Sequence, residues 1–125
     1  MKPEAQRIAI AEACGWQMIQ RPLTDQDGEI PGHVEVRWFH PKIHTSAYPL
    51  YALPQNPPDY LNDLNAIHEA EKTLTRVQRV KFVTELCGLV GVKWKPTSHF
   101  DTIHATAAQR AEAFLRTIGK WEDDK

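Results

Sequence analysis

The chain has 125 residues, of which 42% are hydrophobic, 25% charged and 9% aromatic. This size and composition are typical of one folded domain and exclude a fibrous or wholly disordered protein. The 15 basic and 16 acidic residues give a formal net charge of -1, so no overall positive charge attracts the chain to nucleic acid or to an anionic membrane. We therefore expect a single domain over 1–125, with a frayed acidic tail at 122–125 and no bulk nucleic acid or membrane as partner.

The two cysteines, Cys14 and Cys87, stand beside apolar residues, and each is followed by a glycine. Two cysteines are too few for the disulfide framework of a small secreted protein, so we expect buried free thiols. The apolar run at 8–11 is too short for a signal-peptide core, and no stretch approaches the roughly 20 apolar residues that span a bilayer. These features favour a cytoplasmic protein.

The N-terminal part predicts a helix and then a short strand. Pro3 suits the first turn of a helix, and apolar residues at helical spacing extend it over 3–14 to a stop at Gly15. Residues 16–20 alternate in part, which predicts a strand that ends at Arg21 and Pro22. Turn residues at 25–28 follow, so we expect a loop there.

The clearest strand signal comes next, at 34–38. Val34, Val36 and Trp38 alternate with charged residues, as in a strand with one buried face. Five prolines between 41 and 58 then favour an extended or looped backbone that supplies at best an edge strand.

Two helices are predicted in the next part of the chain. Pro57 and Pro58 open a helix over 58–74, with an apolar stripe along one face. Thr75 and Gln78 form a capping-box pattern that starts a second helix, over 75–88. Because this segment is rich in β-branched valines, it is either a helix buried on two sides or partly strand, and we favour the helix.

The C-terminal part predicts a short strand and a helix. Val92 and Trp94 alternate with lysines before a proline, which indicates a strand. The capping-box pattern of Thr106 and Gln109 starts a helix over 106–118. The elements together predict an α+β fold, a single compact sandwich of about four helices packed on a small sheet.

Three segments resemble the phage ABA sandwich domain, a family of small proteins of tailed bacteriophages and prophages. They are IAIAEACGW at 8–16, PPDYLNDLNAIHEAEK at 57–72, and ATAAQRAEAFLR at 105–116 with Gly119, Lys120 and Trp121. The resemblance implies an α+β sandwich with a small sheet between helices, and a viral origin. It supplies no established catalytic residues. The segments 21–56 and 76–95 are particular to this chain and are where specificity is expected.

Two polar residues lie on or beside the apolar stripe of the helix predicted over 58–74. At about 100° per residue, Glu71 falls within the stripe and His68 on its edge. A buried carboxylate is either neutral or paired, so we expect Glu71 to meet Arg110, Arg116 or His68 in a buried ion pair or hydrogen bond. Ligand binding and acid–base catalysis by His68 and Glu71 remain the alternatives.

The histidines do not predict a metal site. His40 and His44 have i, i+4 spacing, but Pro41 disfavours the helix that this spacing requires, and a predicted loop separates His99 from His104. We expect no metal and no cofactor.

Aromatic and basic residues gather after the strand at 34–38 and around residues 72–81. The candidate ligand-binding residues are Trp38, His40, Tyr48, Tyr51, Arg76 and Arg79. Rings can stack a base and cations can hold a phosphate, so this combination suits a nucleotide. The alternative is that the rings fill the core and the charges are solvated. Trp38 in particular is in phase with Val34 and Val36, which favours the core for this residue.

The chain has no glycine-rich phosphate loop, nucleophile elbow or HExxH motif, so it does not resemble a standard enzyme. With the resemblance, this predicts a phage accessory protein in the host cell cytoplasm that binds without catalysis. We expect it to evade host immunity by sequestering a host defence nucleotide signal or by blocking a host defence protein. The alternative is a small hydrolase or nuclease that uses His68, Glu71 and a loop histidine. An apolar face over Phe82, Leu86 and Leu89 also favours a homo-oligomer.

Overall fold

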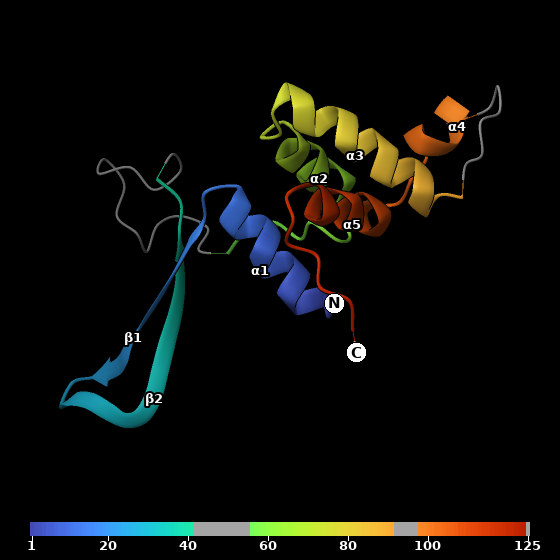
Figure 1. The fold of residues 1–125 in the computed structure, drawn as a ribbon. Coiled ribbons are helices and arrows are strands. Elements are labelled where there is room, and N and C mark those ends of the chain that lie inside the picture. The colour runs from blue at the N-terminus through green and yellow to red at the C-terminus, as the bar shows by residue number, and fades with distance from the viewer. Residues whose placement is uncertain (42–55, 92–97, 125) are drawn as a thin grey trace. The chain divides into compact units, whose positions relative to one another are not determined.

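The computed structural model describes residues 1–41, 56–91 and 98–124 and shows an α+β protein, as the sequence predicts (Figure 1). The elements of the described residues are α1 (Pro3–Ala13), β1 (Gln17–Asp25), β2 (Gly28–Phe39), α2 (Leu64–Glu71), α3 (Arg76–Leu89), α4 (Ser98–Ile103) and α5 (Ala107–Thr117). The contacts divide the chain into two compact units, Met1–Ile10 with Pro58–Lys125, and Ala11–Pro57. We call these the helical unit and the hairpin unit. The single domain expected from the length stays a prediction.

The hairpin unit contains an antiparallel two-stranded sheet, β1 paired with β2. Gln17 pairs with Phe39 at one end and Asp25 with Gly28 at the other, which leaves a two-residue turn. The Oδ1 atom of Asp25 accepts a hydrogen bond from the backbone N–H of Asp27 at 2.8 Å, and Gly28 has a φ of 115° that favours glycine. Both predicted strands and the turn at 25–28 are therefore present, but the predicted end of the first strand at Arg21 and Pro22 is wrong because both strands continue to this turn.

Proline does not end β1 because the sheet formed by the described residues has two strands. Pro22 lies within β1 opposite Val34, and the register shifts between Pro22 and Thr24. Each strand of such a pair has a free edge, where a residue without an N–H removes no ladder hydrogen bond. The shift in register is the irregularity expected beside such a residue.

The turn after α1 holds His40 against the backbone. Gly15 has a φ of 98°, and a Cβ atom at this position would lie 3.3 Å from His40 Nε2. The same Nε2 atom is 2.9 Å from the carbonyl oxygen of Cys14, and the His40 ring meets the Trp16 ring edge-on at 5.2 Å. Gly15 is thus needed both for the backbone conformation and for the close approach of His40.

The core of the helical unit is made by one face each of α2, α3 and α5, with Ile10 from α1. Its fully buried large side chains are Ile10, Ile67, Phe114 and Leu115. Small residues of α5, among them Ala111 and Ala113, are also fully buried and let the neighbouring helices approach closely. Figure 1 shows α2, α3 and α5 grouped together, and α5 contacts both other helices.

α2 is shorter than the helix predicted over 58–74. The Oδ1 atom of Asp63 accepts hydrogen bonds from the N–H groups of Asn65 and Ala66, so Asp63 is the N-cap and α2 begins at Leu64. Asp59 falls in the first turn of the helix predicted over 58–74, but it precedes α2 and forms an ion pair with Arg7 at 2.9 Å. Asn62 also donates to Asp59, and the contacts with Asn62 and Arg7 both lower the pKa of the Asp59 carboxyl. The side-chain cap of Asp63, rather than the two prolines, therefore sets the start of α2.

Both predicted capping boxes are confirmed. Thr75 and Gln78 cap α3, and Thr106 and Gln109 cap α5, each through reciprocal side-chain to backbone hydrogen bonds. α3 is helical over its whole length, so the strand alternative for this segment is excluded. The helix α4 was not expected, because its six residues are too short for an apolar stripe, and it occupies the loop predicted between His99 and His104.

Phe82 and Leu86 do not form a free apolar face. Both are buried in the core, which removes the reason for which they were expected to support a homo-oligomer. The apolar residues that α3 exposes are Val77, Val80 and Val83, with exposed fractions of 80%, 69% and 54%.

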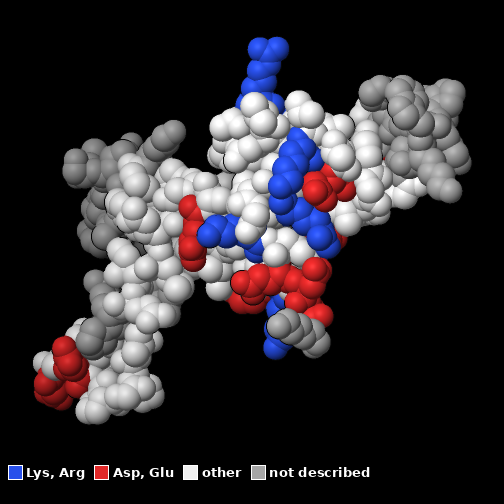
Figure 2. Space-filling view, viewed as in Figure 1, with Lys and Arg blue, Asp and Glu red and all other residues white. Residues whose placement is uncertain are grey.

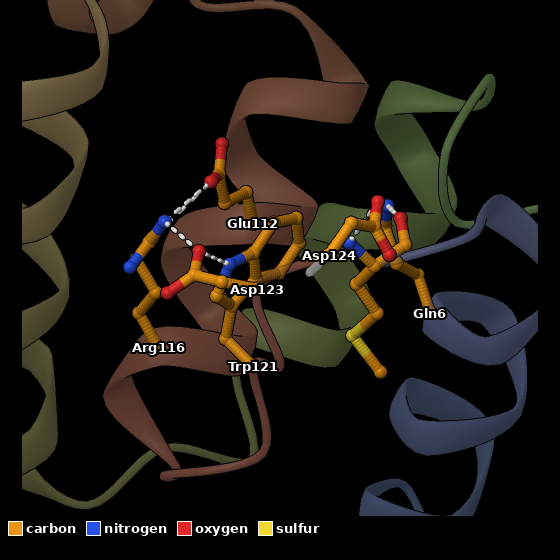
Figure 3. Close-up of polar contacts among 7 residues, drawn as sticks. Gln6, Glu112, Arg116, Trp121, Asp123 and Asp124 are labelled. Carbon is orange, nitrogen blue, oxygen red and sulfur yellow. Dashed lines mark hydrogen bonds and ion pairs between the residues drawn. The ribbon is translucent and has the colours of Figure 1, made fainter.

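The C-terminal segment, expected to fray, makes several polar contacts (Figure 3). Arg116 pairs with Glu112 at 2.9 Å and with Asp123 at 3.5 Å, and its guanidinium lies 5.0 Å from the centre of the Trp121 ring. Trp121 Nε1 donates to Asp123, and Asp124 pairs with the amino group of Met1 at 2.8 Å. These contacts place Asp123 and Asp124 on the helical unit.

Both cysteines are free, as predicted, but they are partly exposed rather than buried. In the described part of the chain, no helix is long and apolar enough to cross a membrane. The strand predicted at 92–94 and most of the proline-rich segment lie outside the described residues.

The capping of α2 gives a test of its start. We expect Asp63→Ala to lower the free energy of unfolding by about 1 kcal/mol, because two backbone N–H groups lose their acceptor. Asn65→Ala, an exposed position in the first turn, is the control and should change stability by less than about 0.5 kcal/mol. Urea unfolding measures both values, and equal effects of the two substitutions would contradict the assigned cap.

Candidate functional site

An open groove of about 430 Å³ lies in the helical unit among α2, α3 and α5. Its polar lining consists of Glu71, Lys72, Arg79 and Arg110, and its apolar lining of Leu74, Phe82 and Val83. Three cations and one carboxylate leave an excess of two positive charges. We call this the α2–α3–α5 groove. Its size falls within the range of small-molecule sites, and its charge favours an anion.

The groove is built around an ion pair between α2 and α5. Arg110 Nε lies 3.0 Å from Glu71 Oε1, and each side chain is only 15% exposed. This confirms the predicted burial of Glu71 and its pairing with a cation of the C-terminal helix. Arg116, the other predicted arginine, instead pairs with Glu112 and Asp123.

The geometry of this ion pair is imperfect. Glu71 Oε1 and Arg110 Nε are both buried, yet neither makes a hydrogen bond with acceptable angles to any described residue. The two atoms are therefore close enough for charge attraction, but the N–H does not point at the oxygen. An unaligned pair of this kind gains less than the aligned fork of an arginine on a carboxylate.

Burial raises the pKa of Glu71 above its ordinary value of 4.5. The positive charges of Arg110 and His68 lower the pKa, but the loss of water around the carboxylate outweighs them. The groove thus contains a carboxylate whose charge is only partly compensated.

Two further contacts fix Arg110. Its Nη1 atom donates to the carbonyl oxygen of Thr102 at 3.0 Å, and its guanidinium lies 5.9 Å from the centre of the Phe82 ring. These contacts hold the guanidinium from the side of α4 and from α3, independently of Glu71. Arg110 can therefore keep its position when Glu71 moves.

The other two cations of the groove differ in their partners. Lys72 pairs with Glu69 at the surface, and both side chains are about 70% exposed, so solvent screens this pair. Arg79 is exposed, and its side chain makes no ion pair or hydrogen bond with any residue that the structure describes. Figure 2 shows basic and acidic side chains close together on the visible face of the helical unit, without an extended surface of one sign.

Of the predicted ligand-binding residues that the structure describes, only Arg79 lines this groove. Arg76 is exposed at the start of α3 and is not among the lining residues. Trp38 and His40 belong to the hairpin unit, where Trp38 is partly buried in β2 opposite Met18 and His40 contacts Cys14 and Trp16. Tyr48 and Tyr51 lie outside the described residues. Their joint role in one site stays a prediction.

His68, expected beside Glu71 as a buried polar residue, is exposed instead. Its side chain is 48% exposed, and its Nε2 atom lies 3.9 Å from Glu71 Oε2. The described residues contain no group of three or more histidine, cysteine or acidic side chains that could hold a metal ion.

A second, smaller hollow of about 220 Å³ is a weaker candidate. It is lined by Glu85, Arg116, Gly119, Trp121 and Asp123. Arg116 is already paired there with two carboxylates, so no cation is left over for a ligand.

The comparisons give no relatives: no family model, curated protein or solved structure matches this chain. The resemblance to the phage ABA sandwich domain therefore stays a prediction.

The raised pKa of Glu71 predicts a pH dependence of stability. A carboxyl with a higher pKa in the folded state stabilises the fold below its ordinary pKa, and this contribution is lost as the pH rises through the folded value. We expect the stability of the wild type relative to Glu71→Gln to fall as the pH rises above 4.5. Chemical unfolding at several pH values measures the difference.

Glu69→Gln is the matched control, because Glu69 is an exposed carboxylate on the same helix. A wild type that gains stability over Glu71→Gln with rising pH would show that Arg110, rather than burial, dominates the pKa of Glu71.

Proposed function

We propose that the protein is a binding module that holds a phosphate-bearing ligand in the α2–α3–α5 groove. The observation that carries the proposal is the convergence of Lys72, Arg79 and Arg110 on one groove with a single carboxylate. Arg79 has no ion-pair partner among the described residues, so binding an anion there requires no competing pair to break. Arginine and lysine are the usual partners of phosphate groups.

A nucleotide fits the remaining features of the groove. Its phosphates would meet the cations, and Leu74, Phe82 and Val83 provide apolar surface against which a base can lie. With the resemblance to phage proteins, we propose that the ligand is a host defence nucleotide signal. The protein would act in the cytoplasm of the infected cell as a phage accessory protein that sequesters this signal and so evades host immunity.

A second candidate is a blocker of a host defence protein. The exposed Val77, Val80 and Val83 of α3 favour it, since exposed apolar residues that lie close together often mark protein contacts. Self-association through the same helix would give the predicted homo-oligomer.

A third candidate is the small hydrolase or nuclease. The 3.9 Å separation of His68 Nε2 and Glu71 Oε2 is the observation that favours it. Glu71 is also paired with Arg110, and no nucleophile motif accompanies His68 and Glu71, so we place this candidate behind the binding module.

One experiment distinguishes the three candidates. The protein is incubated with lysate from phage-challenged cells, reisolated and heat-denatured, and the released small molecules are identified by mass spectrometry. An intact nucleotide supports sequestration, and a cleaved nucleotide supports the hydrolase. Release of no nucleotide contradicts both and leaves the protein blocker.

The lining of the groove predicts that Arg79, rather than Arg76, contributes to nucleotide binding. Arg79→Ala should weaken nucleotide binding by about tenfold or more, since a hydrogen bond to a charged group contributes about 1.5–3 kcal/mol. Arg76→Ala is the matched control, because it removes the same charge from an exposed position of α3 outside the groove. Isothermal titration calorimetry gives the affinities, and thermal unfolding should show both variants folded. Equal losses in the two variants would contradict the groove as the site.

A further inference from the structure

The ion pair of Glu71 and Arg110 places a carboxylate where the ligand of the proposed function would put a phosphate. Arg110 Nε is buried and lies 3.0 Å from Glu71 Oε1, so a phosphate oxygen that binds this N–H takes the place of the carboxylate. Arg110 keeps its contacts with the Thr102 carbonyl and the Phe82 ring in that case. The guanidinium is thus held ready for a second anion.

Because the ion pair is unaligned, replacing Glu71 by another anion as the partner of Arg110 costs little free energy. Glu71 and Arg110 lie 3.0 Å apart, but the N–H of Arg110 has no aligned acceptor and Glu71 Oε1 has no aligned donor. A phosphate oxygen that approaches along the N–H direction gains a hydrogen bond that Glu71 does not make. The ligand therefore replaces a weaker partner with a stronger one.

The displaced carboxylate would then need its own compensation. The charged or titratable groups of the groove and its edge come from three helices: His68 of α2, Lys72 directly after α2, Arg79 of α3 and Arg110 of α5. The ligand engages the three permanent cations in the proposed site, and His68 lies at the edge at 3.9 Å. A mostly buried carboxylate beside a bound anion is best accommodated by taking up a proton.

We infer that the phosphate group of the ligand displaces Glu71 from Arg110, and that Glu71 takes up one proton as the ligand binds. This rests on the proposed function. It goes further by making Glu71 an internal competitor of the ligand. The raised pKa of Glu71 in the free protein agrees with this, because a carboxyl that is already easier to protonate needs less free energy to accept the proton. Affinity for the ligand then falls as the pH rises.

Calorimetry with cyclic di-AMP as the probe tests the inference. Its phosphodiesters keep a fixed charge near neutral pH, whereas a phosphomonoester has a second pKa of about 6 that would add its own proton exchange. Titrations between about pH 5.5 and 8.5, in buffers of different ionisation enthalpy, measure both the affinity and the number of protons taken up. We expect the wild type to take up protons on binding and Glu71→Gln to take up fewer.

The substitution also predicts a gain of affinity. Glu71→Gln removes the competing charge but keeps the side-chain size, so at pH 8 it should bind the probe about tenfold more tightly, within the usual range for coupled equilibria. Glu85→Gln is the control, since it removes one negative charge from α3 outside the groove and should retain the proton uptake of the wild type. His68→Gln should also retain it.

The outcomes are separable. Binding by the wild type without proton uptake, or equal affinities of wild type and Glu71→Gln, overturns this inference and leaves the proposed function standing. Loss of proton uptake in His68→Gln alone overturns it too, since the proton would then reside on the histidine. Absence of binding by the wild type and by every variant at all pH values contradicts the proposed function itself for this class of nucleotide.

Discussion

The ion pair of Glu71 and Arg110 determines how the candidate site is arranged. It joins α2 to α5, and among the described lining residues of the groove it places the only carboxylate against one of three cations. Removing Arg110 would leave a mostly buried carboxylate without its cation, which is far more costly than losing an ion pair at the surface. Removing Glu71 costs less, because Arg110 keeps its contacts with the Thr102 carbonyl and the Phe82 ring, and these contacts preserve the positive character of the groove.

The features that the sequence predicts well are those governed by near neighbours. The capping boxes at Thr75 and Thr106 involve residues three apart, and both are present. The helical period alone predicted that Glu71 faces the interior. A buried carboxylate needs a cation nearby, so the pairing with Arg110 was one of the few possible arrangements. Local rules therefore located the helices of the groove and one of its charges.

The features that the sequence did not predict depend on competition between alternative partners or on contacts between residues that are far apart in the chain. Asp59 and Asp63 are both good N-cap residues, and only the folded chain shows that Asp63 caps α2 while Asp59 pairs with Arg7. β1 continues through Pro22 because the described residues place no third strand beside it that would need a backbone donor at this position, which the sequence of a single strand does not reveal. The groove itself combines residues from three helices, so Lys72, Arg79 and Arg110 could be recognised as one set only after those helices had packed.

The distribution of charge favours a small ligand over a nucleic acid polymer. A chain with a formal net charge of -1 has no general attraction for polyanions, and Figure 2 shows mixed charges on the visible face of the helical unit. A polymer requires cations spaced along a track, whereas the groove of about 430 Å³ gathers three cations in one place. In the proposed function, such a site would neutralise one or two phosphates at a time. Discrimination among anions would then fall to Glu71, because a ligand would have to bind Arg110 more strongly than this carboxylate does in order to enter.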